Sequence, residues 1–311
     1  MQPLRVGLIG WGTVGSALGQ LIVGGSLPLR LTGLAVRDPD RARSAQLPHG
    51  TPIVPPEAAA DDADVVVELA GGADQAFPWA WATLERGLPY VTANKALLAT
   101  HGGELARLAR DRGAALLASA SVGGGTPMIE TVEHLRTREI TRMRGVVNAT
   151  TTFILSAMAE GRSYDSALLQ AQQAGFAEAD PSFDVDGHDA AQKLAILASV
   201  AWGRWQPESA VETRGIADLA PEPGRIIRLV ADATPQRLAV APAELVADDP
   251  LAMVSGAQSI LQVATRDAGT YRISGPGAGG AATAGAVYAD LARLVAGERP
   301  ILFGESVEPA P

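Results

Sequence analysis

Arg5-Val-Gly-Leu-Ile-Gly-Trp-Gly-Thr-Val-Gly15 is the stretch that decides the fold of the first part of the chain. It reads as a short apolar strand, a glycine-rich turn and the start of a helix over 13–23. A dinucleotide-binding motif needs this order, because the glycines let the backbone approach a pyrophosphate at the helix N-terminus. The simpler alternative is a tight turn without a ligand. The residues expected to contact a cofactor are Gly10, Gly12, Thr13, Val14 and Gly15.

Strand-like and helix-like segments alternate through the following hundred residues. Apolar runs at 29–36, 65–69, 89–93 and 114–118 are separated by helical patterns at 75–86 and 103–112. This alternation predicts an α/β domain with a parallel, doubly wound sheet of the Rossmann type. In such a sheet ligands bind at the carboxyl ends of the strands.

Two pairs of residues follow strands where a cofactor is expected. Asp38 lies near the distance at which an acidic residue holds the ribose of NAD, whereas Arg37 could stack on adenine or meet the 2′-phosphate of NADP. The choice between NAD and NADP therefore stays open. Asn94 and Lys95 come directly after the strand at 89–93, so we expect both at the cofactor crevice. The alternative for Lys95 is a solvated loop position.

The pattern changes after residue 126. The sequence predicts a strand at 139–148, helices at 150–160, 164–175 and 190–202, and strands at 226–231, 237–246, 260–266 and 270–274. Strands in a run with one cluster of helices indicate an α+β domain. The glycine turn at 275–280 leads into a helix at 281–295 that we expect to pack back on the first domain. The predicted division is therefore 1–126 plus 280–311 for dinucleotide binding and 127–279 for the substrate.

The segment 175–202 carries the most informative chemistry of the second domain. An acidic loop precedes a helix that is apolar almost all round, in which Asp186 is expected as the N-cap and Asp189 in the first turn. Lys193 lies one turn after Asp189 on an otherwise apolar face. A surface ion pair is the simpler interpretation. A cation on a buried face, however, needs partners or a function such as proton transfer.

Composition excludes several classes of protein. The net charge of −9 argues against nucleic acid or an anionic membrane as a partner, because both require a basic face. No apolar run reaches the length of about 18 residues that a membrane span needs, so we expect a cytoplasmic protein. The absence of cysteine excludes an aldehyde dehydrogenase that works through a thiohemiacetal. A non-catalytic redox sensor that binds NAD(P)(H) stays as the alternative from another class.

Taken together, the motifs resemble those of homoserine dehydrogenase over nearly the whole chain. The stretches that carry the resemblance are G-W-G-T-V-G at 10–15, V-T-A-N-K at 91–95, A-S-V-G-G-G-T-P at 120–127, V-N-A-T-T-T-F-I-L at 147–155, G-F-A-E-A-D-P at 175–181, D-V-D-G-H-D-A-A-Q-K at 184–193 and G-P-G-A-G at 275–279. The resemblance implies reversible, NAD(P)-dependent oxidation of L-homoserine to L-aspartate 4-semialdehyde, on the route to threonine and methionine. It also implies a homodimer formed through the second domain, and we expect no regulatory ACT domain.

The resemblance further implies roles for individual residues. Lys193 looks like the catalytic lysine of the family, which takes the hydroxyl proton as hydride leaves, and Lys95 like its charged partner at the nicotinamide. Glu178 matches the residue that binds the substrate amino group, and Asp184 and Asp189 match acids that line the pocket. Gly277 is expected at the cofactor.

Departures from the family pattern concern a monovalent cation above all. Many relatives have a glutamate where this chain has Ser119, and that carboxylate helps backbone carbonyls to hold Na⁺ or K⁺. Val122, Gly124 and Thr126 could still offer carbonyls, but the charged ligand is lost. Ala149 stands in place of a glycine near the cofactor.

Overall fold

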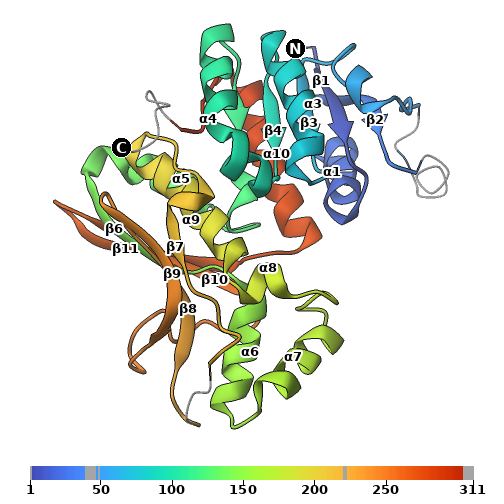
Figure 1. Cartoon of the computed structure of the whole chain (residues 1–311). Coiled ribbons are helices and arrows are strands. Elements are labelled where there is room, and N and C mark those ends of the chain that lie inside the picture. Colours follow the sequence, from blue (N-terminus) through green and yellow to red (C-terminus); the bar gives the residue numbers. More distant parts are fainter. Residues whose placement is uncertain (1, 39–46, 48–49, 220–222, 304–311) are drawn as a thin grey trace. The chain divides into compact units, whose positions relative to one another are not determined.

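The computed structural model describes residues 2–38, 47, 50–219 and 223–303 (Figure 1). The chain divides into two compact units. The first unit comprises Met1–Gly125, Gly203–Trp205 and Gly279–Pro311, and the second comprises Thr126–Trp202 and Gln206–Ala278. Among the described residues, no helix is both long and apolar enough to cross a bilayer.

The first unit contains a parallel sheet with the strand order β2-β1-β3-β4-β5. Its strands are β1 (Leu4–Ile9), β2 (Leu29–Ala35), β3 (Val65–Glu68), β4 (Tyr90–Thr92) and β5 (Leu116–Leu117). Its helices are α1 (Thr13–Gly24), α3 (Ala73–Glu85), α4 (Lys95–Arg112) and α10 (Gly280–Val295), with short 3₁₀ turns η1 (Pro56–Ala58) and η2 (Ser119–Ser121). The predicted Rossmann-type sheet is confirmed, and its order reverses between β1 and β3, where a ligand crevice is expected.

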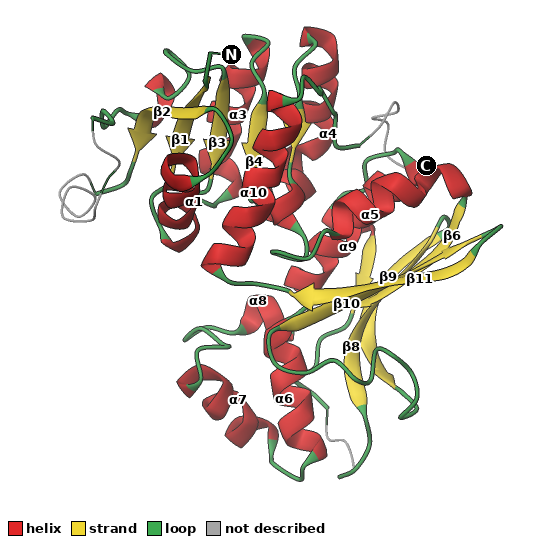
Figure 2. Ribbon diagram, turned by 180° about the vertical axis from the view of Figure 1, so that it is seen from behind, coloured by secondary structure: helices red, strands yellow, loops and turns green. Residues whose placement is uncertain are grey.

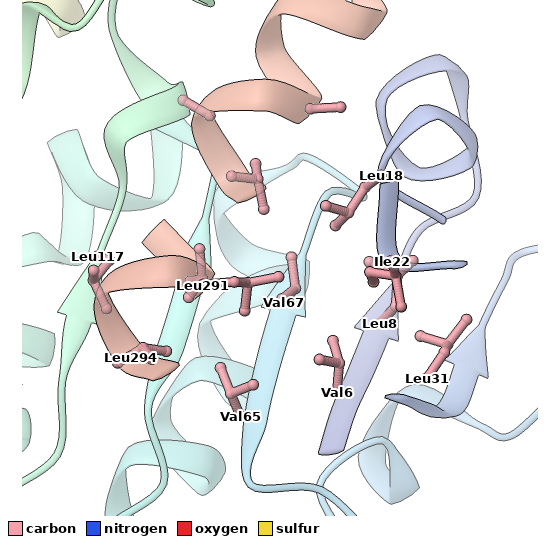
Figure 3. Close-up of a cluster of buried hydrophobic side chains, with 14 of the residues drawn as sticks. Val6, Leu8, Leu18, Ile22, Leu31, Val65, Val67, Leu117, Leu291 and Leu294 are labelled. Atoms are coloured by element: carbon pink, nitrogen blue, oxygen red, sulfur yellow. The ribbon is translucent and has the colours of Figure 1, made fainter. Parts of the chain in front are cut away.

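The core of this unit lies between the sheet and two helices from distant parts of the sequence. Figure 3 shows Leu18 of α1 and Leu291 of α10 close to Val67 of β3 in one apolar cluster. The side chains of β1 and β3 in this cluster are fully buried, since strands covered on both faces are apolar almost throughout. The C-terminal helix is thus part of the nucleotide-binding fold.

The second unit is built on a six-stranded sheet with the order β11-β10-β6-β8-β9-β7. Its strands are β6 (Ile140–Val146), β7 (Val211–Thr213), β8 (Ile227–Thr234), β9 (Arg237–Glu244), β10 (Gln258–Thr265) and β11 (Gly269–Pro276). Neighbouring strands are antiparallel except for β7 and β9. The expected α+β unit is confirmed.

Helices of the second unit gather around this sheet (Figure 2). They are α5 (Met128–Leu135), α6 (Ala149–Ala159), α7 (Tyr164–Gln173), α8 (Ser182–Val185) and α9 (His188–Trp202), with 3₁₀ turns η3 (Arg136–Arg138) and η4 (Glu208–Ala210). Helix α9 packs on β7, β8 and β9 and beside α5. Because α9 is covered on several sides, twelve of its residues, Asp189 included, are buried.

Two expectations about helix starts are wrong. Asp186 does not cap α9: Gly187, with φ of 93°, lies directly before the helix, and its carbonyl accepts the Ala191 N–H at 2.9 Å. The acidic loop that was expected here contains α8 instead. Helix α4 begins at Lys95 and not at 103. Gly102 and Gly103 lie inside the helix, and glycine is a poor indicator of helix in a sequence.

Candidate active site

The glycine turn after β1 forms a cradle with open space in front of α1. Gly10 has φ of 104°, and a Cβ there would stand 2.7 Å from the carbonyl carbon of Leu69, so only glycine fits. A Cβ on Gly15 would clash with the Gly10 carbonyl at 2.2 Å. By contrast, a Cβ on Gly12, the N-cap, would meet nothing within 4 Å. The space beside Gly12, at the N-terminus of α1, is therefore open, which suits a pyrophosphate.

Asn94 and Lys95 begin helix α4 at the carboxyl end of β4. The Asn94 Oδ1 accepts the Leu97 N–H at 3.1 Å and so caps the helix, while its Nδ2 donates to the Gly72 carbonyl at 3.0 Å. Lys95 is the first helical residue and is half-buried. Its backbone is therefore fixed, unlike that of a solvated loop lysine.

The contacts of Arg37 and Gly277 do not by themselves indicate a cofactor site. Arg37 is exposed after β2. Gly277 follows β11 in the second unit, where its N–H donates to Ala257 O at 2.9 Å and a Cβ would stand 2.1 Å from Ser259 Oγ. Close packing against β10 thus accounts for this glycine, and its part in cofactor binding stays a prediction.

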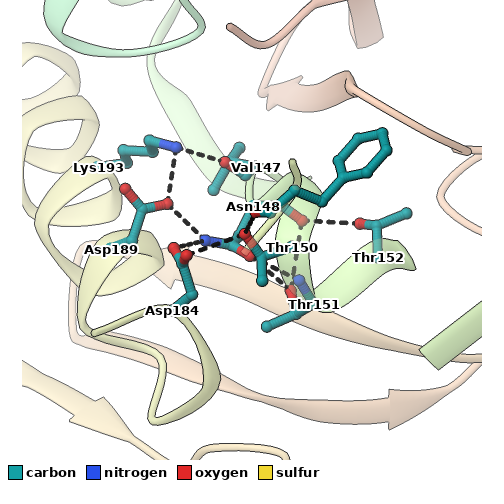
Figure 4. Close-up of polar contacts among 9 residues, drawn as sticks. Val147, Asn148, Thr150, Thr151, Thr152, Asp184, Asp189 and Lys193 are labelled. Carbon is teal, nitrogen blue, oxygen red and sulfur yellow. Dashed lines mark hydrogen bonds and ion pairs between the residues drawn. The ribbon is translucent and has the colours of Figure 1, made fainter. Parts of the chain in front are cut away.

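Lys193 is held on a mostly buried face of α9 (Figure 4). Its Nζ donates to Asp189 Oδ2 and to the Val147 carbonyl, both at 2.7 Å. The side chains of Lys193 and Asp189 are only 14% and 9% exposed. The pair is therefore not a surface ion pair, and both contacts are those of an ammonium donor.

Asn148 links the carboxylates next to Lys193. Its Nδ2 donates to Asp184 Oδ1 at 2.6 Å and to Asp189 Oδ2 at 2.8 Å, and its Oδ1 accepts the Thr151 N–H at 2.8 Å as the N-cap of α6. The Thr150 hydroxyl lies 2.9 Å from Asp184 Oδ2. Figure 4 shows these side chains converging from α6, α8 and α9.

Asn148, Thr150 and the Val147 carbonyl were not expected as site residues. Their signal was the V-N-A-T-T-T stretch, which carried the family resemblance, but within it only Ala149 was singled out, as a departure near the cofactor. The contacts join residues some 40 positions apart, such as Asn148 and Asp189, so helical spacing could not reveal them. Asp184, Asp189 and Lys193, all expected, are brought together.

The remaining acids of the segment lie outside this network. Glu178 is exposed in the loop after α7, where its carbonyl accepts Gln172 Nε2 at 3.1 Å. Hydrogen bonds from Ser182 lower the pKa of Asp180, so this carboxylate serves as a turn cap. His188, the first residue of α9, faces Glu208, with Nδ1 2.8 Å from Oε1.

The loop expected to hold a cation begins beside a buried carboxylate. Ser119 donates its N–H and its hydroxyl to Asp290 of α10, at 3.0 and 2.5 Å, and Asp290 is 1% exposed. Val122 is fully buried, Gly124 has φ of 56°, and the Thr126 hydroxyl donates to Pro276 O at 3.2 Å. Within the described residues, no group of three or more His, Asp or Glu side chains could hold a metal ion.

Lysine is rare in this chain. Lys95 and Lys193 are its only two lysines, and every other basic side chain apart from histidine is arginine. Both stand at sites expected to carry chemistry. One unit of the chain has a nucleotide-binding sheet with a glycine cradle, and the other holds a sheltered amine among carboxylates. Together these features define a nicotinamide-dependent dehydrogenase.

Comparison with known proteins identifies the family. A model of the homoserine dehydrogenase NAD-binding domain matches residues 10–118, and a homoserine dehydrogenase model matches residues 127–292. Homoserine dehydrogenase from Mycobacterium tuberculosis is 38% identical over 93% of this chain and 72% of its own, and the Bacillus subtilis enzyme is 34% identical over 98% and 76%.

Solved structures agree with this assignment. A homoserine dehydrogenase from Thiobacillus denitrificans superposes with a TM-score of 0.92 at 32% identity, over 100% of this chain and 80% of that chain. A hyperthermophilic archaeal homoserine dehydrogenase in complex with NADPH gives 0.86 at 29% identity, over 96% and 100%. The chain belongs to the homoserine dehydrogenase family and is an NAD(P)-dependent oxidoreductase. The resemblance drawn from the motifs is confirmed, and the redox-sensor alternative is not favoured.

Proposed function

We propose that the chain interconverts L-homoserine and L-aspartate 4-semialdehyde with NADP(H) or NAD(H), on the route to threonine and methionine. The observation that carries the proposal is the sheltered Lys193 amine, bonded to Asp189 and to the Val147 carbonyl next to the Asn148–Asp184 pair. This arrangement provides a proton donor beside carboxylates, as a substrate with an ammonium and a reacting oxygen requires.

Lys193 is the proposed acid and base. An ammonium has three N–H donors, and two of those on Lys193 are used by Asp189 and Val147. The third can be donated to the aldehyde oxygen when the semialdehyde is reduced. In the opposite direction the neutral amine takes the hydroxyl proton of homoserine, and a nicotinamide cofactor, when bound, would supply the hydride acceptor.

Carboxylates and Lys95 are the proposed groups that orient the substrate. Glu178, Asp184 and Asp189 provide negative charge for the ammonium and for the hydroxyl end of homoserine. Lys95 stays charged and meets the substrate carboxylate or the oxygen on which charge develops.

Except for Gly277 of the second unit, the proposed cofactor contacts lie along the carboxyl edge of the first sheet. The N–H groups at the start of α1 receive the pyrophosphate, and the open space at Gly12 supports this assignment. The full proposed set is Gly10, Gly12, Thr13, Val14, Gly15, Arg37, Asn94, Lys95 and Gly277. For a Na⁺ or K⁺ ion we propose the backbone carbonyls of Val122, Gly124 and Thr126, and the Asp290 carboxylate beside Ser119 supports a negative charge near this loop.

The proposed setting is a cytoplasmic homodimer that forms through the second unit. The family resemblance supports the dimer, whereas the cytoplasmic setting is the expectation drawn from the sequence. Light scattering on a sizing column tests the dimer directly, since a monomer of 32.0 kDa and its dimer differ twofold in mass.

Oxidation of NADPH and of NADH at 340 nm with aspartate semialdehyde tests the activity. We expect turnover that requires the semialdehyde and reverses with homoserine and the oxidised cofactor. Repeating the assay in sodium, potassium and choline salts tests the cation. Binding of NADPH without any turnover would contradict the proposal and support a sensor.

A further inference from the structure

Glu68 is a fully buried carboxylate at the point where the strand order of the first sheet reverses. It is the last residue of β3, pairs with Ile9 of β1 on one side and Thr92 of β4 on the other, and is 0% exposed. The three strands lie side by side (Figure 1). Burying a charge is costly unless hydrogen bonds replace water, so the contacts of Glu68 decide what it does.

Both oxygens of Glu68 accept hydrogen bonds from loops at the cofactor edge. Oε1 accepts the N–H groups of Ala70 and Gly71 at 2.7 and 2.9 Å. Oε2 accepts the Thr92 hydroxyl at 2.8 Å. Burial, and secondarily the nearby Glu68 carboxylate, raise the pKa of Tyr90 above its ordinary value.

The contacts continue from Thr92 to the start of α4. Because the single hydroxyl hydrogen of Thr92 goes to Glu68, its oxygen is free to accept, and it takes the Asn94 N–H at 2.9 Å. The Asn94 side chain donates in turn to Gly72 O at 3.0 Å, which closes a ring of hydrogen bonds between the β3–α3 and β4–α4 loops. This ring fixes the backbone directly before Lys95.

The first of these loops also supports the glycine cradle. The Leu69 N–H donates to Ile9 O at 2.7 Å. The Leu69 carbonyl carbon lies only 2.7 Å from the position that a Cβ on Gly10 would take. The Glu68 side chain therefore holds the β3–α3 loop and the end of β4, while Leu69 of the same loop packs against Gly10 of the glycine cradle.

We propose that Glu68 is a positioning residue for hydride transfer, which acts through Thr92 and Asn94 to hold the Lys95 amine in its working position. A carboxylate suits these contacts, because both of its oxygens accept hydrogen bonds. A glutamine would turn an NH₂ group toward Thr92 or toward the Ala70 and Gly71 N–H groups. The inference rests on the proposed role of Lys95.

The test compares Glu68→Gln, Thr92→Val, Thr92→Ser, Lys95→Ala and the double variant Glu68→Gln/Lys95→Ala. We expect Glu68→Gln and Thr92→Val to lower kcat by roughly 10- to 100-fold, the scale of a misplacement by about 1 Å. Thr92→Ser keeps the hydroxyl and should recover most of the kcat. The double variant should lose no more kcat than Lys95→Ala alone. Glu85→Gln, an exposed carboxylate on α3, is the matched control.

Thermal unfolding separates positioning from a purely structural role. A lowered melting temperature with wild-type kcat and KM in both Glu68→Gln and Thr92→Val would overturn the inference. So would a loss of kcat in Glu68→Gln/Lys95→Ala that equals the product of the losses in the two single variants. If Glu68→Gln does not fold, the isosteric Thr92→Val and its serine counterpart decide the question. Wild-type kcat in Lys95→Ala would instead overturn the proposed role of Lys95.

Discussion

At the scale of single residues, the choice of lysine over arginine is informative. Arginine keeps its proton at any ordinary pH, whereas a lysine amine can release one. This chain uses arginine for every other strongly basic side chain and keeps an amine only at 95 and 193. A surface ion pair with Asp189 would be served equally well by either residue, so the amine at 193 supports proton transfer.

Lys193→Arg tests this reasoning more sharply than truncation. The guanidinium can keep a charge near Asp189 but cannot give up a proton, so we expect kcat to fall by about 10²- to 10⁴-fold, as in Lys193→Ala. The Kd for NADPH, followed by fluorescence, should change little in either variant. Turnover close to that of the wild type in Lys193→Arg would limit Lys193 to an electrostatic role.

Asn148 has two functions that substitution can separate. Serine is a good N-cap and should keep helix α6 stable, but it lacks the NH₂ group that bridges Asp184 and Asp189. Because the Asp184 and Asp189 carboxylates lose the donor that orients them, we expect Asn148→Ser to raise KM for homoserine by roughly 10- to 100-fold. Its melting temperature should fall less than that of Asn148→Ala, because serine keeps the cap. Asn148→Ala should raise KM similarly and also lower the melting temperature. An unchanged KM in both would remove Asn148 from the substrate site.

At the scale of elements, the spacing of residues predicted those features that depend on neighbours in the sequence. The Asp189–Lys193 contact follows from one helical turn, and the glycine turn before α1 follows from the motif. The start of α4 was not predicted, because two glycines inside the helix are required by distant packing. A Cβ on Gly102 would stand 2.6 Å from Phe303, and a Cβ on Gly103 would stand 2.9 Å from Trp205. Packing partners about a hundred or more residues away require these glycines, and a helical pattern cannot show that.

The glycine cradle allows a comparison within one turn. Gly10→Ala should lower both the melting temperature and the affinity for NADPH, because its φ of 104° and its contact with Leu69 exclude a Cβ. The methyl group of Gly12→Ala meets nothing within 4 Å in the protein, so this variant should keep its stability. It should bind NADPH at least about tenfold more weakly, because the methyl group occupies the space proposed for the pyrophosphate. Thermal unfolding and fluorescence titration measure the two effects. Equal affinity in Gly12→Ala and the wild type would contradict the proposed phosphate position.

At the scale of the whole molecule, the alternation of segments predicted both sheets but not every element. The short strand β7 and the helices α5 and α8 were missed. Each has eight residues or fewer, and Pro181, which is typical of a loop, directly precedes α8. Strand order across the six-stranded sheet depends on pairings between distant segments and was not open to prediction from periodicity.

Global stability should depend on Asp64 at the amino end of the first sheet. The Arg5 guanidinium donates to this carboxylate at 2.8 Å and lowers its pKa below the ordinary value of 3.8. A lowered folded-state pKa stabilises the fold above pH 3.8, and this contribution is lost as pH falls through the folded-state pKa. We therefore expect Asp64→Asn to be less stable than the wild type at pH 7.

The same difference should vanish at low pH. Urea unfolding between pH 7 and 2.5 measures it, and the exposed Asp111→Asn on α4 is the matched control, expected to follow the wild type throughout. A destabilisation by Asp64→Asn that stays constant down to pH 2.5 would show that packing, and not charge, connects Asp64 to Arg5.

The scarcity of lysine makes this chain a convenient spectroscopic subject. Reductive methylation with ¹³C-formaldehyde would tag only Lys95, Lys193 and the terminal amine, which gives a nearly empty spectrum in which each resonance can be assigned by one substitution. The chemical shift of each dimethylamine follows its ionisation, so the proton on either lysine could be titrated directly.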